Sequence, residues 1–237
     1  MARHVPSRIT YPQSTECVNG LLDTTRWPFA ARQVARLYAA VGGVDIVDNT
    51  DTAGYKTKTP IGYLPALAHP EAGLFPNCTF AMGCLQESLA VERYIASLSP
   101  VFNSLPTQEK AVDDMVTMIK EDLMQVEPAA INASLAPAVV TPLYDRYLSV
   151  LEHGPYIPSD GFVNGHPYPT GADLAVLVFL KAKFPFAKAL SNAKYDAQTH
   201  FPKIYALAER TAAHKAVAAY VKTSKTFYGD IAVGEAV

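Results

Sequence analysis

The sequence carries no marked excess of charge of either sign. Its 237 residues include 20 lysines and arginines against 22 aspartates and glutamates, a net charge of −2, and they contain no run of basic residues. Proteins that bind nucleic acid or an anionic membrane usually present a basic patch that neutralises phosphate. We therefore expect neither nucleic acid nor a membrane among the partners of this chain.

Long hydrophobic runs are also missing. The longest apolar run, residues 174–180, is far shorter than the roughly 20 residues that a transmembrane helix needs. Residues 1–8 lack the apolar core of a secretory signal peptide. These absences predict a soluble, cytoplasmic protein.

Cysteine is scarce and unpatterned. Cys17, Cys78 and Cys84 are odd in number and do not have the spacing of metal ligands. We expect neither a disulfide framework nor a metal site.

About half of the chain, 49%, is apolar, which is enough for one large or two small domains with proper cores. A segment that contains proline and serine, residues 99–106, separates a first part of mixed pattern from a second part that is helical almost to its end. This change predicts a domain boundary there.

The first part alternates strands and helices. Apolar residues recur at helical spacing over 28–41, Gly42 and Gly43 supply a stop, and residues 44–48 alternate like a strand. Short apolar strands are predicted at 63–67 and 79–82, and an amphipathic helix at 87–97. A strand-helix-strand unit followed by a strand-strand-helix unit resembles a thioredoxin fold.

The second part reads as a helical bundle. Two apolar stripes lie at helical spacing, the first comprising Val112, Met115, Val116, Ile119, Leu123 and Val126 and the second Val139, Leu143, Tyr147, Leu148 and Leu151. Thr170 with Asp173 forms a capping box, and Pro169 with Leu174 a hydrophobic staple. The spacing predicts that a buried helix over 172–179 starts there.

Two pairs of residues look like a site that grips a peptide by its backbone. Pro65 is tolerated only at the start, edge or bulge of a strand, and a cis bond would turn the backbone of Leu64 outward to pair with an extended ligand. Glu87 and Ser88 open a helix whose N–H groups suit a carboxylate, while the acid suits an ammonium. One end of the ligand would therefore be an amino acid head group. As an alternative, Ser88 is a plain N-cap and Glu87 a first-turn acid.

These residues resemble the glutathione site of the glutathione S-transferase family, and sigma-type transferases in particular. The chain matches the family pattern at Leu64-Pro65, Glu87-Ser88, Ala90-Val91 and Arg93-Tyr94, at the capping box, and over residues 201–207. The resemblance implies an α/β plus all-α fold, in which an N-terminal thioredoxin-like domain precedes an all-helical C-terminal domain. We expect an N-terminal extension over 1–17, a glutathione-binding domain over 18–99 and the helical domain over 106–237.

The resemblance also implies a set of glutathione contacts. Glu87 and Ser88 would meet the γ-glutamyl head, and the main chain of Leu64, ahead of Pro65, would meet the cysteinyl part. Tyr63 stands where relatives often carry glutamine. For the glycine carboxylate Lys56 fits the spacing better than Lys58. The remaining expected contacts are Trp27 and an acid, Asp113 or Asp114, that would reach the ligand of the neighbouring subunit.

The residue that activates the thiol depends on which segment is the first strand, because the thiolate and not the thiol is the nucleophile. In one register Arg8-Ile9-Thr10-Tyr11 is the strand and Tyr11 the catalytic hydroxyl, at the cost of a long insertion before the first helix. In the other, residues 21–28 form the strand end, and Arg26 or Thr25 faces the sulfur. We favour the second register because it fits the spacing to the helix.

The function implied is conjugation of glutathione, as co-substrate, to small apolar electrophiles by a homodimeric transferase with a role in detoxification. Met115 and Met118 are candidates for the lining of the electrophile pocket. Two alternatives remain: a non-catalytic glutathione-binding or scaffold relative, and a glutathione-dependent isomerase or peroxidase.

Overall fold

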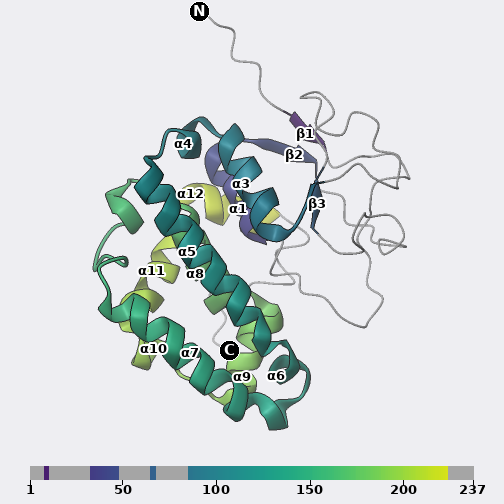
Figure 1. Ribbon diagram of the computed structural model, residues 1–237, viewed down its shortest axis with the longest axis vertical. Helices are drawn as coiled ribbons and strands as arrows, with labels where there is room; N and C mark the ends of the chain where they lie inside the picture. Colours follow the sequence, from purple (N-terminus) through teal and green to yellow (C-terminus); the bar gives the residue numbers. More distant parts are fainter. Residues whose placement is uncertain (1–7, 11–32, 48–64, 68–84, 224–237) are drawn as a thin grey trace, which may run out of the picture. The chain divides into compact units, whose positions relative to one another are not determined.

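A computed structural model describes residues 8–10, 33–47, 65–67 and 85–223 of the chain (Figure 1). Contacts divide these residues into two compact units. Residues 8–10, 38–47, 65–67 and 85–104 belong to the first, and residues 33–37 and 105–223 to the second. The predicted domain limits at 18–99 and 106–237 stay predictions, since much of the first range lies outside the described residues.

The first unit contains the strands and the helices next to them. Its elements are β1 (Arg8–Thr10), α1 (Gln33–Gly42, of which residues 33–37 group with the second unit), β2 (Asp45–Val47), β3 (Ala66–Leu67), β4 (Leu85–Gln86), α3 (Ser88–Leu98) and α4 (Pro100–Asn103). β1 pairs in parallel with β2, with Ile9 opposite Ile46. β3 pairs antiparallel with β4, with Ala66 opposite Gln86. The order of elements is the strand-helix-strand and strand-strand-helix order that the sequence predicts.

The strand that pairs with β2 differs from the one we favoured. β1 covers Arg8–Thr10 and pairs with β2, which agrees with the strand of the first register. The extension expected over 1–17 and the choice between the two registers stay predictions. Residues 21–28 lie outside the described part of the chain.

The short strands were the hardest elements to predict. β2 confirms the strand expected at 44–48, and β3 lies within the strand expected at 63–67. β4 falls where the sequence predicts no strand, because two residues carry no periodicity, and Gln86 is polar. The strand expected at 79–82 lies outside the described residues.

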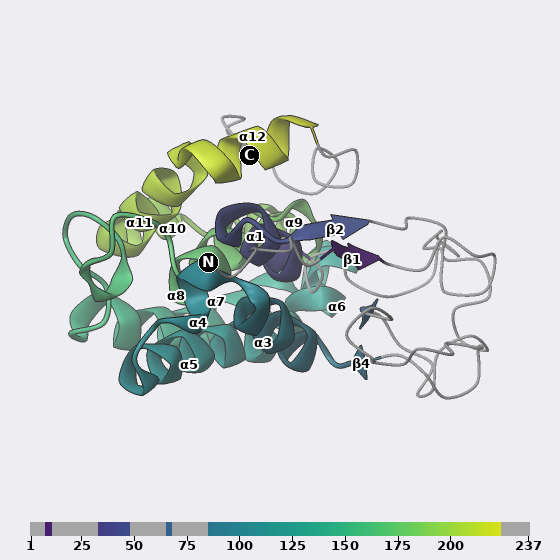
Figure 2. The same ribbon diagram turned by 90° about the horizontal axis from the view of Figure 1, so that it is seen from above.

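All elements in the described part of the second unit are helices, joined by loops (Figures 1 and 2). Its α-helices are α5 (Thr107–Leu123), α6 (Glu127–Ile131), α7 (Ala136–His153), α8 (Gly171–Lys181), α9 (Lys188–Ala193), α10 (Ala197–His200), α11 (Pro202–Ala213) and α12 (Lys215–Thr223). Short 3₁₀ turns cover Met124–Val126, Ala133–Leu135 and Val163–Gly165, and a π-helical turn covers Lys183–Ala187. α5 and α11 both pack against α8.

The core of this unit is α8. Every residue from Gly171 to Leu180 is buried, as the uninterrupted apolar sequence requires of a helix with neighbours on all sides. In the two predicted stripes the innermost residues include Val116 and Leu123 of α5 and Leu148 and Leu151 of α7. None of the described helices is long and apolar enough to cross a bilayer.

Candidate functional site

Among the described residues of the first unit, Glu87 is the one non-glycine residue with a positive φ. It precedes α3 with φ 71° and ψ 123°, and its exposed side chain makes no capping bond to the helix. A residue with a Cβ rarely adopts a positive φ, and holding it there costs on the order of 1–3 kcal/mol. Its carbonyl still accepts the first helical bond, from Val91 N–H at 3.0 Å. The side chain of Glu87 is therefore exposed, while its carbonyl still takes part in the first turn of α3.

The start of α3 offers donors to a ligand. The first N–H groups of a helix have no partner within the helix, and here Glu87 does not cap them with its own side chain. Ser88, the first helical residue, is half-buried. A hydroxyl and N–H groups at the positive end of a helix dipole suit a carboxylate.

Pro65 and Glu87 lie at the same end of the β3–β4 ladder. Pro65 is buried and leads directly into β3, while Glu87 follows β4 directly. Because Ala66 pairs with Gln86 in an antiparallel register, the residue before Ala66 and the residue after Gln86 meet at that end. The structure thus brings together two parts of the predicted grip, from positions far apart in the sequence.

Most of the other predicted site residues lie outside the described part of the chain. These are Tyr11, Thr25, Arg26, Trp27, Lys56, Lys58, Tyr63 and Leu64. The peptide bond between Leu64 and Pro65, expected to be cis, also lies outside the described residues. Their roles stay predictions.

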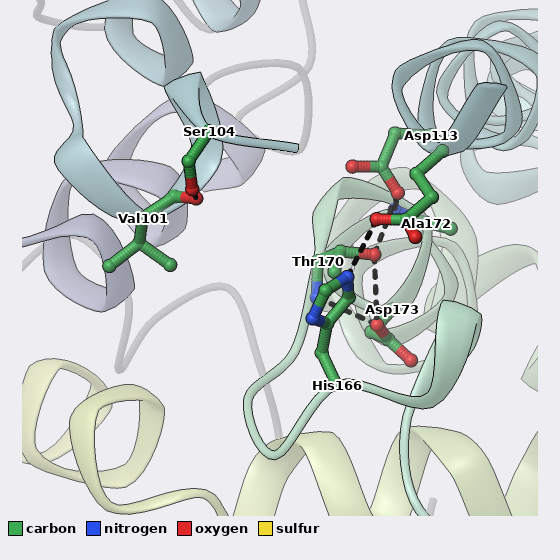
Figure 3. Close-up of polar contacts among 8 residues, drawn as sticks. Val101, Ser104, Asp113, His166, Thr170, Ala172 and Asp173 are labelled. Carbon is green, nitrogen blue, oxygen red and sulfur yellow. Dashed lines mark hydrogen bonds and ion pairs between the residues drawn. The ribbon is translucent and has the colours of Figure 1, made fainter. Parts of the chain in front are cut away.

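Asp113 of α5 has partners within the second unit (Figure 3). It is 4% exposed, and its Oδ1 accepts bonds from Thr170 Oγ1 at 2.7 Å and from Ala172 N–H at 2.9 Å. These bonds give the carboxylate a structural task at the start of α8 that sequence reasoning missed. The neighbouring Asp114 is half-buried. A glutathione contact of either acid stays a prediction.

The two methionines considered for the electrophile pocket differ in exposure. Met118 is 55% exposed on α5, whereas Met115 is half-buried. Exposure of Met118 is compatible with a ligand contact, and the part of both methionines in an electrophile pocket stays a prediction.

Solved structures resemble the chain over most of its length. Na-GST-3, a glutathione S-transferase from the hookworm parasite Necator americanus, has a TM-score of 0.63 at 19% identity, over 91% of this chain and 96% of that chain. The glutathione S-transferase of Ascaris lumbricoides has a TM-score of 0.62 at 20% identity, over 91% and 95%. Rat hPGDS, in complex with a quinoline, has a TM-score of 0.62 at 18% identity, over 93% and 98%. No protein-family model and no curated protein matches the sequence.

The chain therefore has the fold of the cytosolic glutathione S-transferases, a thioredoxin-like part followed by a helical part. This confirms, for the fold, the resemblance found in the sequence. At identities this low the likeness does not extend to chemistry, which has to be argued from the residues.

Proposed function

We propose that the chain is a glutathione S-transferase, which binds glutathione at the start of α3 and adds its thiolate to small apolar electrophiles. The observation that carries the proposal is the strained backbone of Glu87 beside the half-buried hydroxyl of Ser88. Strain of this kind persists where a site needs a side chain in one direction. An ordinary helix cap needs no such residue, since aspartate, serine or threonine caps a helix without a positive φ.

The chemical groups of glutathione match the groups at this site. Its γ-glutamyl head carries an ammonium and a carboxylate. In the proposed complex Glu87 faces the ammonium, and the Ser88 hydroxyl and the N–H groups of the first turn of α3 bind the carboxylate. The backbone before Pro65 pairs with the cysteinyl part as an added strand would. Lys56 neutralises the glycine carboxylate.

Activation of the thiol is assigned to Tyr11. β1 ends at Thr10, so Tyr11 is the next residue after a strand that is paired with β2. A hydroxyl there can donate to the sulfur and stabilise the thiolate, which lowers the pKa of the glutathione thiol. The pairing of β1 with β2 supports Tyr11 over Arg26 and Thr25 in this proposal.

A conjugation assay with glutathione and an apolar aryl halide tests this assignment. Tyr11→Phe removes only the hydroxyl, and we expect kcat to fall about 100-fold or more while KM for glutathione changes little. Arg26→Ala and Thr25→Ala serve as matched controls and should retain most of the activity. Loss of turnover in Arg26→Ala together with full activity in Tyr11→Phe would reverse the assignment.

Two other outcomes of the assay bear on the function itself. Saturable glutathione binding without turnover of any electrophile would identify the chain as a non-catalytic binding protein. A soluble homodimer is part of the proposal, because Asp114, the less buried of the two candidate acids, is expected to reach the ligand of a second subunit. Sedimentation of the purified protein tests that part separately.

A further inference from the structure

Two buried carboxylates meet at the start of α8. Asp113 of α5 is 4% exposed and Asp173 of α8 is fully buried, as is Thr170. The single hydroxyl of Thr170 lies 2.7 Å from Asp113 Oδ1 and 3.2 Å from Asp173 Oδ2 (Figure 3). The two acids are therefore linked through one hydroxyl inside the core.

The remaining bonds to this pair come from neutral backbone donors. Val163 N–H donates to Asp173 Oδ1 at 2.9 Å, Thr170 N–H to Asp173 Oδ2 at 2.7 Å, and Ala172 N–H to Asp113. The partners that the described part of the structure gives these two acids include no lysine, arginine or histidine. A buried charge without a counter-charge is costly, and two of them repel each other as well.

Proton counting gives the same conclusion. One hydroxyl has one proton and can donate it to only one carboxylate at a time. With Thr170 donating to Asp113, its contact with Asp173 is a hydrogen bond only when Asp173 itself carries a proton. Burial raises the pKa of Asp113 and, with Asp113 as a nearby negative charge, raises that of Asp173 to about 7.

A second contact joins the same two parts of the unit. Glu109, one helical turn before Asp113 on α5, bonds His166 through Oε2 and Nε2 at 2.7 Å, and the ring of His166 stacks on Tyr168. One face of α5 thus holds the 163–173 segment at two points. The pair Glu109–His166 gains its ionic part only when the imidazole is protonated.

Other charged groups near Asp113 and Asp173 either change a pKa or bond to other partners. Asp114 adds a weak repulsion that raises the pKa of Asp113, and Glu109 and Asp113 add to the effect of burial in raising that of Tyr168. Lys120 of α5 forms an ion pair with Glu121. On α11, Arg210 donates to the carbonyls of Pro158, Ser159 and Gly161, Glu209 accepts from Lys181, and Lys203 donates to the carbonyl of Gly154.

We propose that Asp113, Thr170 and Asp173 share one proton near neutral pH and form a pH-sensitive latch between α5 and the 163–173 segment. With the proton in place the latch is closed and α8 starts from a fully bonded cap. Loss of the proton leaves two like charges in the core, and the segment opens locally. The latch lies in the second unit and does not depend on glutathione binding.

The direction of the pH effect follows from the proton balance. Asp173 holds its proton more tightly in the folded state, with a pKa of about 7, than in the unfolded state, where it titrates near 3.8. Its contribution to stability is therefore complete below about pH 4 and is lost as the pH rises through about 7.

Amide hydrogen exchange measured from pH 5 to 8 on the full chain tests the latch. After correction for intrinsic exchange, we expect the opening constant at Val163 and Ala172 to rise with pH, by up to tenfold per pH unit at the steepest point. Asp113→Asn removes one charge of the pair and should flatten this rise. Asp122→Asn, an exposed acid on the same helix, is the control and should leave it unchanged.

Two results would overturn the proposal: opening at Val163 and Ala172 that is independent of pH in the wild type, or an unchanged rise in Asp113→Asn. Should that variant fail to fold, the carboxyl ¹³C shifts of the wild type decide the question. We expect the resonance of Asp113 or Asp173 to titrate between pH 6 and 8, and titration of both below pH 5 would refute the shared proton.

Discussion

At the scale of single residues, the backbone of Glu87 is the clearest sign of a built site. Glycine adopts φ 71° without the clash that a Cβ brings, so Glu87→Gly should relieve the strain. We expect this variant to be about 1 kcal/mol more stable in urea unfolding, yet to bind glutathione more weakly because the carboxylate is gone. Glu87→Ala is the control, since it loses the same carboxylate and keeps the strain.

The comparison of these two variants separates strain from charge. Glu87→Ala should have the stability of the wild type, and both variants should lose affinity by a similar factor. A destabilised Glu87→Gly would mean that the positive φ carries no strain worth relieving.

Single residues also show which structural roles could be predicted from the sequence. The capping box of Thr170 and Asp173 is confirmed because its signal is local, with a fixed spacing of three residues. The task of Asp113 was hidden because its partners lie 57 and 59 positions away. The positive φ of Glu87 could not be predicted, since glutamate has no preference for that backbone conformation.

At the scale of elements, Ser99 joins three helices of the first unit. It lies between α3 and α4, donates from Oγ to the carbonyl of Gly42 at 3.0 Å, and accepts from the N–H groups of Val101 and Phe102. The end of α1 is thereby fixed against the junction of α3 with α4. Since α3 begins at the proposed glutathione site, this junction helps to hold the site in place.

The close approach at this junction makes a prediction for Gly42. A Cβ on Gly42 would lie 2.6 Å from Ser99 Oγ and 2.7 Å from Ser99 Cβ. We expect Gly42→Ala to cost about 1–3 kcal/mol in thermal or urea unfolding through overpacking. Ser99→Gly removes both clashing atoms, so the double variant should be less destabilised than the sum of the two single variants.

Ser97→Gly provides the matched pair for that cycle. Ser97 lies on α3, two residues before Ser99, and its exposed hydroxyl donates to the carbonyl of Tyr94 in the preceding turn. Its combination with Gly42→Ala should be additive. Additivity in the Gly42→Ala and Ser99→Gly pair would contradict the contact.

Elements with strong local signals were predicted best. α8 follows from its cap and its apolar run, and α3 from its amphipathic pattern. β1 lies in the strand of the register that we did not favour, and β4 was not predicted. Two or three residues are paired by contacts distant in sequence and not by their own periodicity.

At the scale of the whole molecule, fold and function rest on different arguments. The fold is supported by solved structures that match at least 91% of the chain in the examples given, and by the order of its elements. Function rests on a small site at the start of α3, of which Pro65, Glu87 and Ser88 are described. A fold shared by many proteins does not by itself fix what one of them binds.

The central claim is that the start of α3 holds glutathione, and titration calorimetry of glutathione into the wild type and Ser88→Ala tests it most directly. We expect saturable binding by the wild type. Ser88→Ala should bind about 10-fold or more weakly, because a hydrogen bond to a charged carboxylate is lost. Ser97→Ala, further along the same helix, should bind as the wild type does. No saturable binding by the wild type, or equal affinity in Ser88→Ala, would contradict the account.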